Sequence, residues 1–202
     1  VRLDPNLTTD DGQKLGYTWT DIVENWHERA FTSFGDGHGV WESDGGLVLP
    51  FYPRNFKDVT QWSSRIARNQ LMPTILSLLP DFIRVPPGDG LPRTLGLTAD
   101  KVESQGLDLS RALGTSQKGL VWAGVSEGEP IDHSKRMRTM SRERSTVVQV
   151  TNLGITVKDS PQNTLVFVTR LDTGTAVAGA RVSLIDRDNH VRWEDTTGVD
   201  GT

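Results

Sequence analysis

The chain of 202 residues contains no cysteine, which excludes disulfides, thiol nucleophiles and thiolate metal sites. It has no apolar run approaching the roughly 20 residues that span a bilayer, and no basic-then-apolar leader opens it. A net charge of −4 with a pI of about 5.6 gives no general affinity for a nucleic-acid backbone. Hydrophobic residues make up only 35% of the chain, which suits thin β-sandwiches whose alternate strand residues face water.

Sequence motifs for catalysis are also missing. The chain has four histidines: His27, His38, His133 and His190. None has the i, i+4 pairing of a zinc protease, and Glu28, which follows His27, lacks the second histidine of that motif. No Gly-x-Ser-x-Gly elbow is present for a serine nucleophile. We therefore predict no catalytic, cofactor-binding or metal-binding residues.

One alternative places an enzyme at a cluster of acids. Asp36, Glu42 and Asp44 lie close in sequence and could form a sugar-hydrolysing pair, although acids are common in hairpin turns because they are well solvated. The glycine-rich stretch Gly35–Gly39 is a second candidate, for phosphate or calcium. A phosphate loop needs a following helix and a calcium loop needs several carboxylates, whereas Val40–Glu42 is typical of a strand. A tight turn between strands is the favoured interpretation.

The clearest pattern runs from Ser145 to Thr202, where short β-branched or aromatic runs alternate with Gly, Asp and Asn clusters. The predicted strands are Thr146–Val150, Ile155–Val157, Thr164–Leu171, Arg181–Ile185 and His190–Glu194, with turns at Asp172–Gly174 and Asp186–Asn189. Asn152–Gly154 reads as a hinge between modules. Period-2 runs at this spacing predict an antiparallel sandwich.

The upstream part continues this pattern less regularly. Strands are predicted at Ala30–Phe34, Val40–Glu42, Leu47–Pro53, Val59–Ile66, Leu107–Leu109 and Gly119–Val125. The prolines of Leu47–Pro53 confine it to an edge position or to a polyproline-like extension. Leu113 is predicted to belong with the short strand at Leu107–Leu109, before a turn at Gly114, and Arg84–Pro92 reads as a loop.

Two segments favour helices. Trp19, Ile22, Val23 and Trp26 have helical spacing, but they could also line an irregular strand. Farther on, Asn69 is predicted to cap a helix over Gln70–Leu79 that Pro73 interrupts.

Tryptophans and one basic loop leave further alternatives open. Core anchoring is favoured for the tryptophans because each lies in or beside an apolar run, whereas exposed ones would suggest a glycan or partner surface; they are Trp19, Trp26, Trp41, Trp62, Trp122 and Trp193.

The polar stretch Ser126–Arg144 contains the basic run Lys135–Arg138. A solvated hairpin loop is favoured there over an anion or protease-sensitive site.

The C-terminal residues resemble a known family. Val147–Lys158 is similar to the junction between two macroglobulin-like domains of bacterial α2-macroglobulins, in which the last strand of one domain runs into the first strand of the next. The same resemblance holds for Thr164–Thr169, Thr173–Gly174, Val177–Ala180 and Val182–Leu184, with Ala176 in place of the usual proline. Upstream, Leu49–Tyr52 with Asn55 and Val59 resembles the opening strands of a preceding macroglobulin-like domain, and Thr196–Gly201 resembles a turn that the family continues into another strand.

The resemblance implies an all-β fold of tandem macroglobulin-like, Ig-like or fibronectin III-like, antiparallel sandwiches with one or two short helices. The expected division is residues 1–45 as the C-terminal part of a preceding β-domain, 46–151 as one sandwich, and 152–202 as the N-terminal half of a truncated further sandwich, so the chain is expected to be a fragment. A half sandwich predicts an uncovered apolar face at Leu165, Phe167, Val182 and Leu184 or their alternates.

The same resemblance implies a non-catalytic scaffold segment of a periplasmic or secreted, often lipid-anchored protein that traps proteases after bait cleavage. Its partners would be proteases, through the full-length protein, and neighbouring macroglobulin-like domains; nucleic acid is not expected, and any lipid anchor lies outside these residues. Without cysteine these residues cannot contain the thioester that many members carry. The alternative is an Ig-like adhesin or a glycan- or protein-binding surface module.

Overall fold

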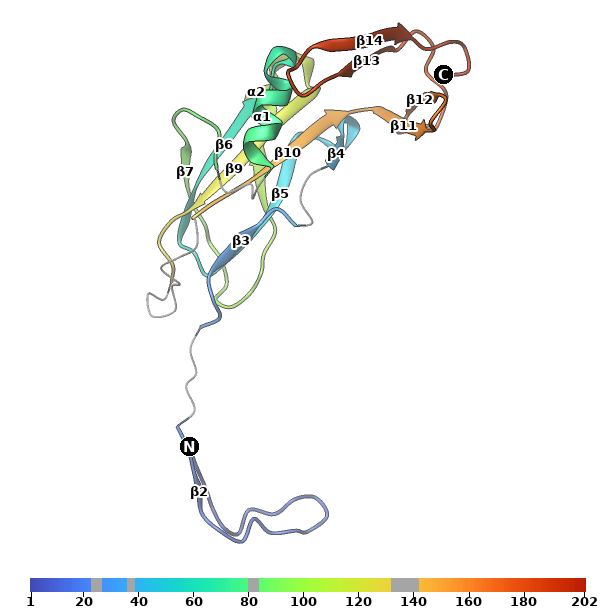
Figure 1. The fold of residues 1–202 in the computed structure, drawn as a ribbon. Coiled ribbons are helices and arrows are strands. Elements are labelled where there is room, and N and C mark those ends of the chain that lie inside the picture. Colours follow the sequence, from blue (N-terminus) through green and yellow to red (C-terminus); the bar gives the residue numbers. More distant parts are fainter. Residues whose placement is uncertain (23–26, 36–38, 80–83, 132–141) are drawn as a thin grey trace.

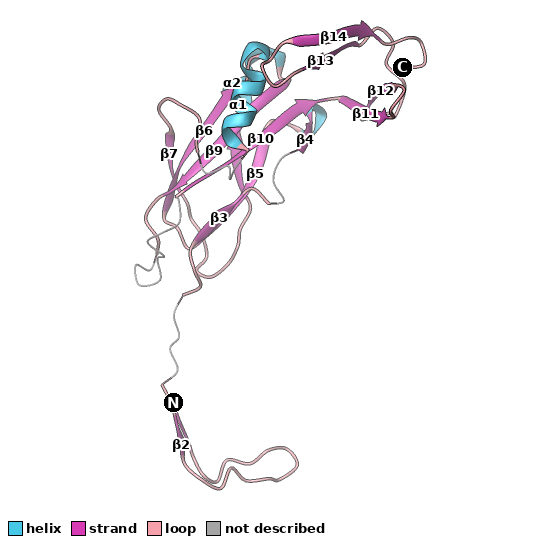
Figure 2. Ribbon diagram, viewed as in Figure 1, coloured by secondary structure: helices cyan, strands magenta, loops and turns pink. Residues whose placement is uncertain are grey.

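The structure is a computed structural model that describes residues 1–22, 27–35, 39–79, 84–131 and 142–202. It is mostly β, which confirms the predicted fold class. The described residues from 31 to 151 form its main body, which carries short helices beside the sheets (Figures 1 and 2). Among the described residues, no helix has the length and apolar character needed to cross a bilayer.

The larger sheet of the main body has five strands within the described ranges. In spatial order they are β4 (Gly39–Glu42), β10 (Glu143–Thr151), β9 (Gly119–Glu127), β6 (Asp58–Arg65) and β7 (Leu91–Thr94). Its pairings are antiparallel apart from β4 with β10, where Val148 lies opposite Gly39 in a parallel ladder. This parallel pair at the edge is an exception to the antiparallel pairing predicted for the sandwich. Parallel pairing is possible because a long stretch of chain, enough for a crossover, separates the two strands.

The smaller sheet contains β3 (Phe31–Ser33), β5 (Val48–Arg54) and β8 (Gln105–Asp108), with β5 in the middle. The prediction that its prolines confine β5 to an edge is wrong. Residues 48–51 pair with β8, whereas residues 52–54 pair with β3, so each half of β5 has a ladder on one side only. A residue without an N–H is tolerated where one side of a strand is unpaired, which accounts for Pro50 and Pro53.

One hydrophobic core lies between these two sheets. Its most deeply buried side chains come from both, and Phe51, on β5, has none of its surface exposed. The core consists of Leu49, Phe51, Phe56, Val59, Leu95, Leu107, Leu109, Leu113, Val121, Ala123, Val125, Val148 and Val150. Alternating residues of β9 and β10 supply this core because successive side chains of a strand point to opposite faces.

Short helices and 3-10 turns connect the strands in the described part of the chain. They are α1 (Leu71–Leu78), α2 (Ser110–Leu113), η1 (Ser43–Gly45), η2 (Arg68–Gln70) and η3 (Gly114–Ser116). Pro73 does not interrupt α1, because it occupies the first turn, where backbone N–H groups have no partner within the helix. Leu113 belongs to α2 rather than to a strand, and the predicted loop Arg84–Pro92 runs into strand β7.

The N-terminal residues form a small separate hairpin, β1 (Arg2–Leu3) with β2 (Trp19–Thr20). The helical interpretation is thus wrong at Trp19, and Val23 and Trp26 lie outside the described residues. Only the strand alternative is compatible with the pairing of Trp19 with Leu3.

The C-terminal segment contains two further antiparallel pairs, as predicted from its pattern. They are β11 (Leu153–Asp159) with β12 (Thr164–Arg170), and β13 (Arg181–Ile185) with β14 (Val191–Thr196). The expected uncovered apolar face is present in part: Leu165 is 47% and Leu184 62% exposed, while Phe167 and Val182 are half-buried.

Candidate functional site: the junction between the main body and the C-terminal segment

The chain passes from the main body into the C-terminal segment at Asn152, between β10 and β11. This residue is buried, with 5% of its surface exposed. Its carbonyl accepts the Leu171 N–H at 3.0 Å, its Oδ1 accepts the Asp172 N–H at 3.3 Å, and its Nδ2 donates to Asp44 Oδ2 at 3.3 Å. The predicted hinge is therefore cross-linked to two other parts of the chain, and its position is fixed rather than free.

An ion pair next to this asparagine strengthens the turn that follows β12. Arg170 donates through Nε and Nη2 to the two oxygens of Asp172, at 3.0 and 2.8 Å. These two bonds hold the pKa of Asp172 far below its usual range and raise the pKa of Arg170. A carboxylate that is charged throughout the physiological range keeps both bonds in place.

A second contact joins hairpin β13–β14 to helix α1, although the two are far apart in sequence (Figure 1). The Met72 N–H donates to Asn189 Oδ1 at 3.0 Å, and Asn189 Nδ2 donates to the Arg68 carbonyl at 3.1 Å. The residue before α1, Gln70, makes no side-chain cap, and the predicted cap Asn69 lies within η2. Asn189 therefore supplies the N-terminal cap of α1 from the C-terminal segment.

Beside this cap lies an ionic cluster of Arg68, Arg181, Ser183 and Glu194. Glu194 Oε2 accepts from Arg68 Nη2 at 3.0 Å and from Ser183 Oγ at 2.7 Å, and its Oε1 lies 2.6 Å from Arg181 Nη2. These partners, Arg181 first, lower the pKa of Glu194 from 4.5 to about 2. Of the four, Arg68 alone belongs to the main body, so the cluster ties the hairpin to η2 through charge.

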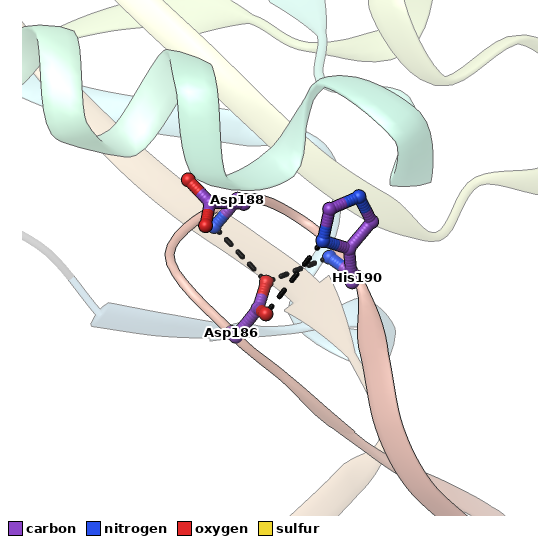
Figure 3. A group of neighbouring side chains, drawn as sticks. All are labelled: Asp186, Asp188 and His190. Carbon is purple, nitrogen blue, oxygen red and sulfur yellow. Dashed lines mark hydrogen bonds and ion pairs between the residues drawn. The ribbon is translucent and has the colours of Figure 1, made fainter.

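The turn between β13 and β14 gathers Asp186, Asp188 and His190, whose ligand-type atoms lie within 4.8 Å of one another (Figure 3). Asp186 already uses both oxygens: one accepts the backbone N–H groups of Asp188 and His190 at 3.0 and 2.8 Å, and the other accepts Arg192 Nε at 2.6 Å. These bonds, the one from His190 first, lower the pKa of Asp186. The group thus shapes the turn that presents Asn189, which has a φ of +65°.

Substituting Asn189 with glycine is expected to destabilise the folded chain by about 1 kcal/mol, because the side-chain hydrogen bonds to Met72 and Arg68 are lost while the positive φ is retained. Thermal unfolding and hydrogen exchange of the Met72 amide measure the effect. Asn189→Asp is the matched variant: it keeps the acceptor and should preserve most of the protection at Met72. Unchanged exchange in Asn189→Gly would contradict the capping role.

Lowering the pH through the range from about 4.5 to about 2 is expected to loosen hairpin β13–β14 from η2. The folded pKa of Glu194 lies below its unfolded value, so its stabilisation is complete above the unfolded value and is lost as pH falls through the folded one. A carbon-detected NMR titration of the carboxyl group measures this directly. Glu194→Gln should remove the corresponding change in amide exchange of the hairpin, and titration of Glu194 near 4.5 would contradict the cluster.

The acids proposed for catalysis have other surroundings. Asp36 lies outside the described residues, and Glu42 is exposed on β4. Asp44 accepts hydrogen bonds from Ser43 Oγ and from Asn152 at 3.3 Å each, which places it in the junction. Of the stretch Gly35–Gly39, only Gly35, with a φ of +78°, and Gly39, at the start of β4, are described.

Two of the histidines can be placed, and His38, His133 and the basic run Lys135–Arg138 lie outside the described residues. His27 bonds through Nδ1 to Asp100 Oδ2 at 2.9 Å, and the buried Asn55 donates to Asp100 Oδ1 at 2.8 Å. His27 and then Asn55 lower the pKa of Asp100 to about 2. This group fastens the chain entering the main body.

The tryptophans divide between core and surface. Trp41 packs against the core, as expected. Trp62 and Trp122 are only half-buried, and Trp62 donates to the Gly88 carbonyl at 3.0 Å, so it holds a loop rather than anchoring the core. Trp193 is 49% exposed, so core anchoring is wrong for it.

Fold and junction together define a β protein in which a two-sheet main body is joined by side-chain contacts to a C-terminal segment of two hairpins. Residues 150–202 match the family model described as the bacterial alpha-2-macroglobulin MG3 domain, which confirms the resemblance to bacterial α2-macroglobulins. The match begins at Val150, within β10. No curated protein matches the chain.

Solved structures show the same fold. Native alpha-2-macroglobulin from Escherichia coli spanning domains MG0-NIE-MG1 aligns over 99% of this chain and 64% of its own, with 14% identity and a TM-score of 0.71. A segment spanning NIE-MG1 covers 86% and 85%, with 16% identity and a TM-score of 0.62. A Salmonella alpha-2-macroglobulin mutant covers 99% and 12%, with 14% identity and a TM-score of 0.57. The chain thus spans less than two thirds of the first of these structures.

The domain numbers differ between the two comparisons. The sequence match is to a domain numbered MG3, whereas the crystal structures span MG0 to MG1. Likeness at 14% to 16% identity shows the fold alone, so the solved structures do not assign a domain number to these residues.

Proposed function

We propose that the chain is a non-catalytic scaffold segment of a bacterial α2-macroglobulin that traps proteases outside the cytoplasm. The observation that carries this proposal is the family match of residues 150–202, which starts in β10, the strand that also completes the larger sheet of the main body. The chain runs from β10 through the buried Asn152 directly into β11, so the two units are joined at a fixed point, which is what a scaffold of linked sandwiches requires.

The proposed division has one sandwich at residues 46–151 and the first half of another at 152–202. The segment 1–45 is proposed as the end of a preceding β-domain, and it also supplies β3 and β4 to the sheets of the first sandwich. The exposed Leu184 and Trp193 support a half sandwich, because further strands of such a domain would cover them.

In this function, proteases are partners of the whole protein. The junction residues keep adjacent sandwiches in a fixed arrangement, and bait cleavage and enclosure of the protease take place in other parts of the molecule. The Ig-like adhesin alternative has weaker support, because Trp193 is paired across the hairpin with Leu184, another exposed apolar residue.

The test uses the protein as its source produces it. Intact mass and cell fractionation should show these residues inside a polypeptide much larger than 22.3 kDa in an extracytoplasmic fraction. After exposure to trypsin, the purified protein should retain trypsin that cleaves a small peptide substrate but no longer cleaves a large protein. A mature chain of 22.3 kDa, or trypsin that remains fully active on the large substrate, would contradict the proposal.

A further inference from the structure

A groove of about 580 Å³ lies beside the junction, and residues from the start of α1, the end of β10 and the start of β11 line it. Its apolar lining includes Leu71, Leu120 and Leu153. Leu71 and Leu120 are half-buried and Leu153 is 40% exposed, so the groove offers apolar surface to a ligand.

The charges of this groove have a single sign. Arg65, Arg68 and Lys118 are among its lining residues, and no Asp or Glu is found among those that the structure describes. On a chain whose net charge is −4, this gathering of cations is a local exception. A ligand that complements the groove must therefore combine negative charge with apolar surface.

One carboxylate already occupies a place beside it. Arg68 forms an ion pair with Glu194 at 3.0 Å, which shows that a guanidinium lining this groove can bind a glutamate side chain. Arg65 is held in position as well, because its Nη1 donates to Ser116 Oγ at 3.0 Å. Its guanidinium lies beside Gly119, which has no side chain to occupy that space. The remaining N–H groups of a positioned guanidinium bind carboxylates at a low entropic cost.

We propose that this groove binds an extended, acidic polypeptide segment whose alternate side chains are apolar. Its carboxylates pair with Arg65 and Lys118, and its apolar side chains pack on Leu71, Leu120 and Leu153. An extended peptide can direct its acidic side chains to the cations and its apolar side chains to the leucines, because its successive side chains point to opposite sides. This site is separate from the scaffold role proposed above, because holding adjacent domains requires Asn152 and Asn189 but no ligand in the groove.

The test measures fluorescence anisotropy of a fluorescein-labelled peptide, Glu-Leu-Glu-Val-Glu, with the intact protein. We expect saturable binding that weakens from about 0.02 M to about 0.5 M salt, and no comparable binding of Gln-Leu-Gln-Val-Gln or Lys-Leu-Lys-Val-Lys. The double variant Arg65→Gln with Lys118→Gln should bind the acidic peptide about tenfold more weakly, as loss of two charge contacts predicts.

The matched control is Lys14→Gln with Lys158→Gln, which removes the same charge from exposed positions outside the groove. It should bind the acidic peptide within about twofold of the unmodified protein. Both double variants should unfold at nearly the same temperature as the parent, since all four side chains are exposed. Equal weakening in both, equal binding of the neutral peptide, or no saturable binding would overturn the proposal.

Discussion

Replacing Phe51 with alanine is expected to lower the free energy of unfolding by about 3–5 kcal/mol, a large effect for a single core substitution. Phe51 has none of its surface exposed and lies on the middle strand of the smaller sheet. Its ring contacts that of Phe34 with a centroid distance of 6.3 Å. The substitution removes the buried ring and leaves a cavity that the two sheets cannot close, because β5 is fixed by hydrogen bonds to β8 along one half and to β3 along the other.

Urea unfolding monitored by tryptophan fluorescence measures this change. Val48→Ala is the control, since Val48 lies on the same strand but is 56% exposed, and it should cost less than about 1 kcal/mol. If the Phe51→Ala protein unfolded at the same urea concentration as the Val48→Ala protein, this would contradict the placement of Phe51 in the core between the two sheets.

The strands were the part of the fold that the sequence could predict. Strands β12 (Thr164–Arg170) and β13 (Arg181–Ile185) lie within one residue of their predicted bounds, because runs of β-branched and aromatic residues favour extended backbone. The family match also confirms the resemblance of the residues around Val150.

How the strands are arranged in sheets was not predictable from these local patterns. The middle position of β5 and the parallel pairing of β4 with β10 depend on long-range register, and Pro50 is read locally as an edge signal. Strand β7 was missed because Pro92 and neighbouring glycines give the local signature of a loop, although it pairs with β6 over four residues.

The junction site was missed for a similar reason. Capping rules look for an acceptor next to the helix, so they select Asn69, whereas the acceptor that bonds Met72 is Asn189, 117 residues away. Arg68 and Glu194 are 126 residues apart. The local signals were the predicted hinge Asn152–Gly154 and the turn Asp186–Asn189, neither of which predicts the contact with α1.

Most of the contacts described across the junction are polar. The exposed apolar residues of the hairpin, such as Leu184 and Trp193, are not the ones that make these contacts. Ser183 and Glu194 are directly paired across β13–β14 and both reach Arg68, whereas Leu184 pairs with Trp193. Because side chains alternate along strands, one face of the hairpin binds the main body and the opposite face carries the exposed apolar pair. The hairpin thus binds the main body through one face and leaves the apolar pair exposed on the other.

Replacing Gly201 with alanine is expected to destabilise the C-terminal segment by about 2–4 kcal/mol, through backbone strain and steric overlap. Gly201 is buried with a φ of +82°, and a Cβ there would lie 2.7 Å from the Val168 carbonyl oxygen and 3.0 Å from the ring of Phe167. Its own carbonyl accepts the Val168 N–H at 2.9 Å, so the backbone cannot retreat without losing that bond. Hydrogen exchange of the Val168 amide and thermal unfolding measure the change.

Gly179→Ala separates the two causes, because Gly179 has a φ of +71° but no atom within 4 Å of the place that an alanine methyl group would take. This control should cost only about 1 kcal/mol, the strain of a positive φ on an alanine. The difference between the two variants then measures the overlap with the backbone of β12. If Gly201→Ala were no more destabilising than Gly179→Ala, the turn at Gly201 would not be packed against Val168, and the core of the C-terminal segment would have to be assigned to other residues.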